Sequence, residues 1–165
     1  MKRWLVFYTK SRHEKEVDKF LTKRGFEVFL PLQKVLRQWS DRKKKVEVPL
    51  FNSYIFVHET PDKIPLILQT PGISWNIRHN DKPAFLRDEE LEVIKRFLSS
   101  GFFVEAITTP DLEVGHQVEV IDGALKGLRG NIIHSSAGDK FSIALESIQQ
   151  NMIITLDPIA LRVIK

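Results

Sequence analysis

The chain of 165 residues contains no cysteine. Without thiols it cannot form disulfide bonds or thiolate metal sites, and a reducing cytoplasm is the setting that we expect for it. Long hydrophobic runs are also missing, because the apolar run at the start, residues 4–8, is too short for a signal peptide or a membrane span. We therefore expect a cytoplasmic protein without a membrane segment.

The sequence also lacks the residue patterns that catalysis requires. The five histidines have no metal-ligand spacing, and the acidic cluster at residues 88–92 stands where the N-terminus of a helix favours carboxylates. The glycine-rich segment 123–130 has neither the Lys-Ser/Thr ending nor the following helix of a phosphate loop. We expect no enzyme activity, no catalytic residue, no metal site and no cofactor.

Charge is distributed unevenly along the chain. Residues 1–99 contain 20 Lys or Arg and 13 Asp or Glu, whereas residues 100–165 contain 5 and 8. The first part is therefore basic and the second mildly acidic. Such a difference in sign indicates two modules, of which the first faces a polyanion.

The first module alternates strand and helix patterns. Val17, Phe20 and Leu21 recur at helical spacing and Gly25 follows as a helix terminator, which predicts a helix over residues 14–24. Similar reasoning predicts helices at residues 64–70 and from Asp88 onward, and strands at residues 4–8, 28–30, 34–39, 43–50, 53–58 and 73–77. This order favours a sheet with helices packed on it.

The second module has a different residue pattern. Residues 101–112 have the Ser, Thr, Gly and Pro content of a linker, and short β-branched runs separated by glycine or polar turns follow in residues 113–165. These runs favour five strands of a small barrel that closes its own edges. Three glycines at 123, 127 and 130 allow a tight turn and a close backbone approach.

Two stretches resemble one known family. The segment GHQVEVIDGALKGLRGNI, residues 115–132, looks like a KOW motif, and WLVFYTKSRHEKEV, VFLPL, WSDRKKKVEVPLF and NSYIFV resemble in order the first domain of NusG-type factors. The resemblance implies an α+β chain with three parts. These are a ferredoxin-like N-terminal antiparallel sheet with packed helices (1–100), a linker (101–112) and an SH3-like KOW β-barrel (113–165).

The resemblance also implies a function in transcription. NusG-type factors grip the coiled-coil clamp helices of the largest subunit of RNA polymerase with an aromatic patch, and thereby suppress pausing or termination. The family's contact positions fall here on Tyr8, Phe51, Tyr54 and Phe56. Two-residue periodicity puts Tyr54 and Phe56 on one strand face, although aromatic residues on strands are often core residues instead.

Basic residues gather at two places in the first module, the loop after the first strand and the expected hairpin. Positive charge within reach of phosphates can bind upstream DNA or the non-template strand, and an aromatic ring among the charges can stack on a base. The candidate nucleic-acid-binding residues are Lys10, Arg12, His13, Arg37, Trp39, Arg42, Lys43 and Lys44.

Several choices stay open at the level of sequence. The KOW domain has a ribosomal protein, a termination factor, the first domain or nothing as its partner, and we expect a monomer. The segment WSDRKKKVEVPLF favours a specialised, operon-specific antiterminator over a housekeeping factor. The competing class is a ribosome-associated KOW protein that binds RNA, but such a barrel would carry its own basic surface, and residues 100–165 have a net charge of −3.

Overall fold

A computed structural model of the protein describes residues 1–108, 114–135 and 138–164. The chain divides into two compact units, Met1–Glu92 and Val93–Lys165. Both combine helical and antiparallel strand segments, which confirms the predicted α+β class. Within the described residues, none of the helices has the length and apolar character that crossing a membrane requires.

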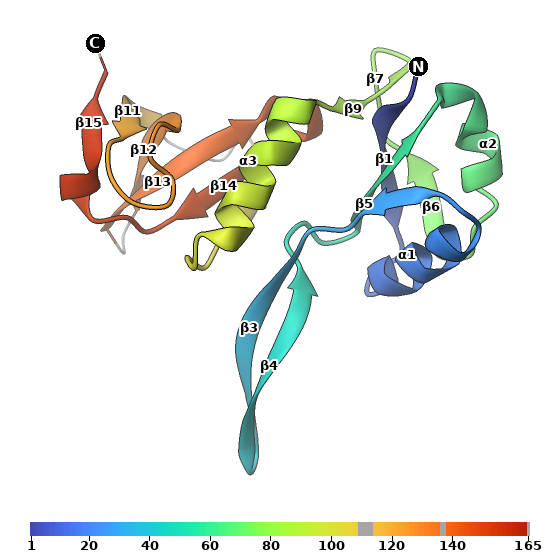
Figure 1. Ribbon diagram of the computed structural model, residues 1–165, viewed down its shortest axis with the longest axis horizontal. Helices are drawn as coiled ribbons and strands as arrows, with labels where there is room; N and C mark the ends of the chain where they lie inside the picture. Colours follow the sequence, from blue (N-terminus) through green and yellow to red (C-terminus); the bar gives the residue numbers. More distant parts are fainter. Residues whose placement is uncertain (109–113, 136–137, 165) are drawn as a thin grey trace. The chain divides into compact units, whose positions relative to one another are not determined.

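The first unit is built on an antiparallel sheet in which β1 is the central strand (Figure 1). Strand β1 pairs with β5 on one side and with β6 on the other, and it also pairs with β9 near its start. The sheet strands are β1 (Arg3–Thr9), β2 (Glu27–Phe29), β5 (Tyr54–Glu59), β6 (Ile73–Asn76) and β9 (Phe85–Leu86), in the order β2-β5-β1-β6.

One face of this sheet is covered by α1 (Glu14–Lys23) and α2 (Ile64–Ile67), which follows the 3-10 turn η1 (Pro61–Lys63). Leu5 and Phe7 from β1 pack there in one cluster with Val17 and Leu21 from α1. Since side chains alternate along a strand, Trp4, Val6 and Tyr8 lie on the opposite face. The helices thus leave the second face of the sheet to other contacts.

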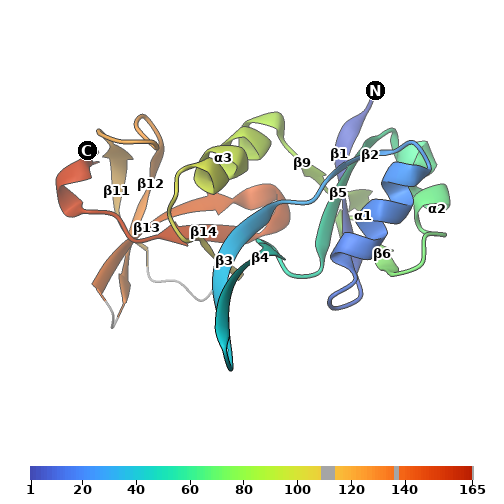
Figure 2. The ribbon, with the colours of Figure 1, turned by 60° about the horizontal axis from the view of Figure 1, so that its bottom comes forward.

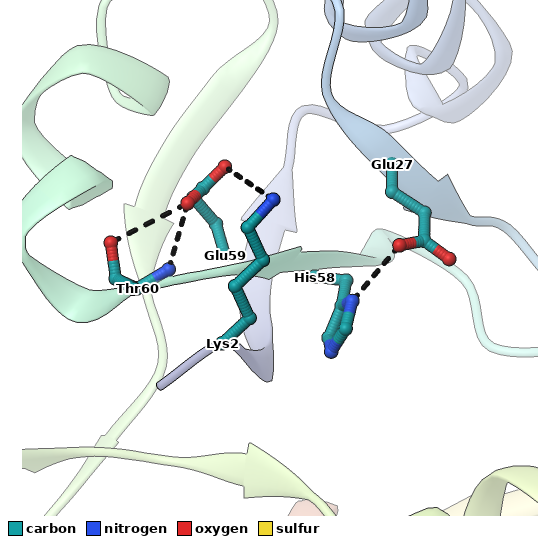
Figure 3. A network of polar contacts seen from close by, with 5 residues as sticks. All are labelled: Lys2, Glu27, His58, Glu59 and Thr60. Carbon is teal, nitrogen blue, oxygen red and sulfur yellow. Dashed lines mark hydrogen bonds and ion pairs between the residues drawn. The ribbon is translucent and has the colours of Figure 1, made fainter.

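Polar contacts fasten the ends of three strands to one another (Figure 3). The Glu59 carboxylate lies 3.9 Å from Lys2 Nζ and accepts a hydrogen bond from the backbone N–H of Thr60. On the same strand, β5, His58 Nδ1 lies 2.9 Å from Glu27 Oε1 on the neighbouring strand β2. These contacts join β1, β5 and β2 at the end of the sheet remote from Tyr8.

Two hairpins leave the main sheet. The larger joins β3 (Leu32–Trp39) and β4 (Arg42–Pro49), which pair only with each other through a turn at Ser40 and Asp41, as predicted. Both views show this hairpin extending well beyond the sheet of its own unit (Figures 1 and 2). The smaller hairpin, β7 (Arg78–His79) and β8 (Lys82–Pro83), was not predicted.

Helix α3 (Asp88–Ser99) spans the boundary between the two units. Its start is fixed by Glu90, whose Oε1 accepts a hydrogen bond from the backbone N–H of Arg87, as in a capping box. Its second half belongs to the second unit, where Phe97 is fully buried with its ring centroid 6.4 Å from that of Phe141. Arg96 also donates hydrogen bonds to the carbonyl oxygens of Ala124 and Lys126.

The described residues of the second unit form one antiparallel sheet of six strands. Its 3-10 turns are η2 (Glu146–Ile148) and η3 (Pro158–Ala160). Along the path β10-β14-β13-β12-β11-β15, the strands are β10 (Glu105–Thr108), β11 (Val114–Val120), β12 (Arg129–Ser135), β13 (Gly138–Leu145), β14 (Gln150–Ile154) and β15 (Leu161–Val163).

The division into units differs from the sequence-based one. The boundary lies after Glu92 rather than at residue 100, because the second half of α3 packs on the second sheet. Part of the expected linker forms β10, a sixth strand that pairs with β14 from Glu105 to Thr108. Residues 109–112 of that linker lie outside the described residues.

Two glycines of the KOW-like segment are required for different geometric reasons. Gly127 has φ +93°, a left-handed conformation, and its N–H donates to Val120 O at 2.8 Å to close the turn. At Gly130 the backbone of the next strand comes so close that an added Cβ would collide with Ser142 O. The expected close backbone approach is therefore present at Gly130.

We predict that Gly130→Ala lowers the free energy of unfolding of the second unit by about 3 kcal/mol or more, because the methyl group must displace paired backbone. Urea unfolding followed by NMR signals of the β13 amides measures this loss. Gly138→Ala is the control, since its methyl meets no atom within 4 Å and carries only the cost of a positive φ, about 1–2 kcal/mol. Equal losses in the two variants would contradict the proposed collision.

We also predict that Phe97→Ala destabilises the second unit by about 3–5 kcal/mol, because it removes a fully buried ring. The same urea titration measures this change. Phe103→Ala is the matched control, since its ring is 62% exposed and its loss should cost little. If Phe97→Ala left the β13 amides as stable as the control does, α3 would not belong to the second unit.

Candidate functional site

Three aromatic side chains form a row across neighbouring strands of the first sheet. Tyr8 on β1 stands opposite Tyr54 on β5 and opposite Trp75 on β6. The Tyr8 and Trp75 rings are stacked, with centroids 4.7 Å apart and planes 5° apart. The Tyr8 and Tyr54 rings meet edge to face at 5.7 Å. We call Tyr54, Tyr8 and Trp75 the aromatic row.

The aromatic row lies on the face of the sheet that the helices leave open. Tyr8 alternates with Phe7, whose side chain packs in the helix-covered core. Trp75 is 54% exposed, and both tyrosines are partly exposed. Stacked aromatic rings that hold one another in place lose little side-chain freedom on binding, which suits them as anchors for a partner.

The other two candidate contact residues are buried. Phe56 is fully buried and Phe51 is 2% exposed, with ring centroids 6.4 Å apart. The ring centroid of Phe56 also lies 6.0 Å from that of Phe29, and the Phe29 ring in turn contacts Trp4. In this structure Phe51 and Phe56 are packed side chains, and Phe56 shares the face of β5 on which Tyr54 lies. Their burial follows the core interpretation that the sequence left open, and the contact role of the four residues stays a prediction.

Trp75 is the member of the row that sequence reasoning missed. Two-residue alternation would put Trp75 on the same face as Ile73, which is buried in the helix-covered core. A register shift between Tyr8 and Thr9, where β1 pairs with β6, changes this relation. Ile73 pairs with Thr9 and Trp75 with Tyr8, so the irregularity turns Trp75 to the open face. No periodicity in the sequence signals such a shift.

The candidate basic residues lie in the loop after β1 and on the hairpin. Lys10 and Arg12 are exposed, and Arg12 has φ +64°. His13 precedes α1 and its Nδ1 lies 2.8 Å from Ser11 O. Arg37 is exposed on β3, and Arg42, Lys43 and Lys44 are exposed on β4 near the tip. The side chain of Trp39 lies outside the described part of the structure.

The structure brings only some of these residues together. Arg12 from the loop and Arg37 from β3 line the same cleft at the base of the hairpin. Arg42 and Lys43 lie farther along, beside the turn. Lys10 is held at the sheet, where its backbone N–H donates to Gly72 O at 2.8 Å.

The hairpin places like charges directly opposite each other. Arg37 pairs with Lys44 across the two strands, and such pairs destabilise a sheet. No described side chain of β3 or β4 is buried, so no core offsets this repulsion within the hairpin. A polyanion bound along the hairpin would remove the repulsion.

Comparison with known proteins agrees with the fold. The family model described as "Transcription termination factor nusG" matches residues 2–95. A solved structure, described as "Domain interaction in Thermotoga maritima NusG", superposes with a TM-score of 0.60 at 17% identity, covering 100% of this chain and 98% of that chain. No curated protein sequence gives a match. Because the family model spans more than half of the 165 residues, the chain belongs to the NusG family of transcription factors.

Proposed function

We propose that this protein binds the clamp helices of RNA polymerase through its aromatic row and suppresses pausing or termination during elongation. NusG-family proteins are transcription elongation and termination factors that bind RNA polymerase. The observation that carries the finer proposal is the exposed row of Tyr54, Tyr8 and Trp75 on the open face of the sheet. An aromatic surface of this kind suits the apolar side of an amphipathic helix.

The hairpin would add contacts to nucleic acid in the same complex. Arg37 and residues 42–45 concentrate five positive charges around one turn that contains Asp41 as its only acid. Phosphate attraction needs only positive charge within reach, so the upstream duplex and the non-template strand are both suitable partners. The extension of the hairpin beyond its sheet supports this role (Figure 2).

We further propose a specialised, operon-specific antiterminator rather than a housekeeping factor. The segment WSDRKKKVEVPLF, which forms most of the basic hairpin and the turn after it, supports this assignment. The alternative, a ribosome-associated protein that binds RNA through its KOW unit, is disfavoured by the net charge of −3 over residues 100–165. A pull-down that retains ribosomes but not RNA polymerase would favour the alternative.

We predict that Tyr54→Ala and Trp75→Ala each weaken binding to RNA polymerase by about 1–3 kcal/mol, because Tyr54 is a partly exposed and Trp75 an exposed aromatic anchor. Biolayer interferometry with immobilised core polymerase measures the change. Phe20→Ala is the matched control, since Phe20 is 45% exposed on α1, which covers the opposite face of the sheet. Unchanged affinity of both folded row variants would remove the aromatic row from the site.

We predict that replacing Arg42, Lys43 and Lys44 with Gln weakens binding to a reconstituted elongation complex and flattens its salt dependence. Each lost phosphate contact lowers the slope of log K against log salt by about 0.7–0.9. Binding to core polymerase without nucleic acid should stay unchanged, which separates this effect from the aromatic row. An identical salt slope in variant and parent would assign these three side chains to solvent.

A further inference from the structure

Glu14, the first residue of α1, is a buried carboxylate. It is 4% exposed, and its Oε2 accepts a hydrogen bond of 2.8 Å from the backbone N–H of Ser53, which lies 39 residues further along the chain. Among the residues that the structure describes, no basic side chain forms an ion pair with Glu14. Burying a carboxylate is costly, so the hydrogen bond to Ser53 is the contact that offsets this cost.

A negative charge at the start of a helix has a common structural explanation, because it interacts favourably with the helix dipole. Glu16, the other acidic residue in the first turn of α1, is exposed and is sufficient for that interaction. The dipole gives no reason to bury a carboxylate or to direct it at another segment of the chain. The burial of Glu14 therefore has to be explained by what it contacts, the turn at Ser53.

The turn at Ser53 has a backbone conformation that needs support from its surroundings. Ser53 has φ +68°, a left-handed value that residues other than glycine rarely adopt. Its N–H donates to Glu14, and its carbonyl oxygen accepts a hydrogen bond of 2.8 Å from the N–H of Thr9 at the end of β1. Phe51, two residues before Ser53, packs against Phe56. The turn is thus fixed from α1, from β1 and from the packed aromatic side chains.

Tyr54 of the aromatic row follows Ser53 directly and is the first residue of β5. Its pairing with Tyr8 is the last in the β1–β5 register, so the Tyr54 ring stands at the end of a strand, where pairing opens most easily. The N–H of Tyr54 donates to Phe51 O at 3.3 Å, which is longer than the usual range. The edge-to-face contact of Tyr54 with Tyr8 therefore depends on how firmly the Ser53 turn is held.

We infer that Glu14 is a positioning residue for the aromatic row. Its hydrogen bond to the Ser53 N–H holds the start of β5, so that the Tyr54 ring is already in place when a partner arrives. This inference rests on the proposed contact of the row with RNA polymerase. It adds to that contact a residue that acts through Tyr54, from the helix-covered side of the sheet.

Two substitutions of Glu14 separate the reach of the side chain from its charge. Glu14→Gln keeps the length and a carbonyl oxygen that accepts the Ser53 N–H, whereas Glu14→Asp keeps the charge but is one methylene too short. We expect the Gln variant to bind core polymerase within about twofold of the parent. The Asp variant should bind about three- to tenfold more weakly, because Tyr54 must then be ordered on binding. A role of the charge alone predicts the reverse order. Biolayer interferometry without nucleic acid measures both affinities.

A second measurement needs no polymerase. The chain contains only 2 tyrosines, Tyr8 and Tyr54, and both belong to the aromatic row. In full-length protein with ring-labelled tyrosine, the nuclear Overhauser effect between the two rings should persist in the Gln variant and weaken in the Asp variant. If Tyr54→Ala leaves polymerase binding unchanged, the proposed function fails, and this measurement still decides whether Glu14 positions Tyr54.

Two control variants separate positioning from general loss of stability. Glu16→Ala removes an exposed acid from the same helical turn, and Val17→Ala loosens the core under α1 without touching the Ser53 turn. Well below the unfolding temperature, both should keep polymerase affinity within about twofold of the parent.

The Asp variant has a substitute if circular dichroism shows that it is poorly folded. Glu14→Asp is then combined with Ser53→Gly and compared with Ser53→Gly alone, since glycine adopts the positive φ without strain while the hydrogen bond stays absent. The combined variant should still bind more weakly. Equal affinities of the Gln and Asp variants, an unchanged signal between the tyrosine rings in the Asp variant, or an equal loss in Val17→Ala would overturn the inference.

Discussion

The pairing of β1 with strands on both of its sides is the interaction on which the first unit depends. Because β1 lies in the middle of the sheet, its alternate side chains must serve two faces. Leu5 and Phe7 build the core under α1, and Tyr8 stands in the aromatic row. The same backbone register therefore determines both stability and the binding surface. A slip of one residue would exchange the two sets of side chains.

Sequence patterns predicted those helices and strands that have strong local signals. The spacing of Val17 and Leu21 predicted α1, and the Ser40 and Asp41 turn predicted the hairpin, because these features depend on neighbouring residues only. Strand β10 and the burial of Phe97 in the second unit were not predicted. Both depend on packing or pairing with residues that are distant in the sequence, such as Phe141. Local propensity does not contain that information.

The sequence predicted only part of the candidate site, for a similar reason. Tyr54 and Phe56 lie on one face of β5, but alternation cannot tell that the first is partly exposed and the second fully buried. Trp75 was missed because the shift in pairing between β1 and β6 reverses the face that simple counting assigns. A regular two-residue period cannot assign a sheet face to residues that lie at an irregularity in strand pairing.

The stacking of Trp75 on Tyr8 gives the protein an optical signal at its open face. Of the tryptophans whose side chains are described, Trp4 is 9% exposed beside His58, whereas Trp75 is 54% exposed. Indole emission shifts to shorter wavelength when water is excluded from the ring. A tyrosine ring 4.7 Å from an indole also transfers its excitation to it efficiently. Any partner that covers this face therefore alters the intrinsic fluorescence, so that occupancy is readable without a label.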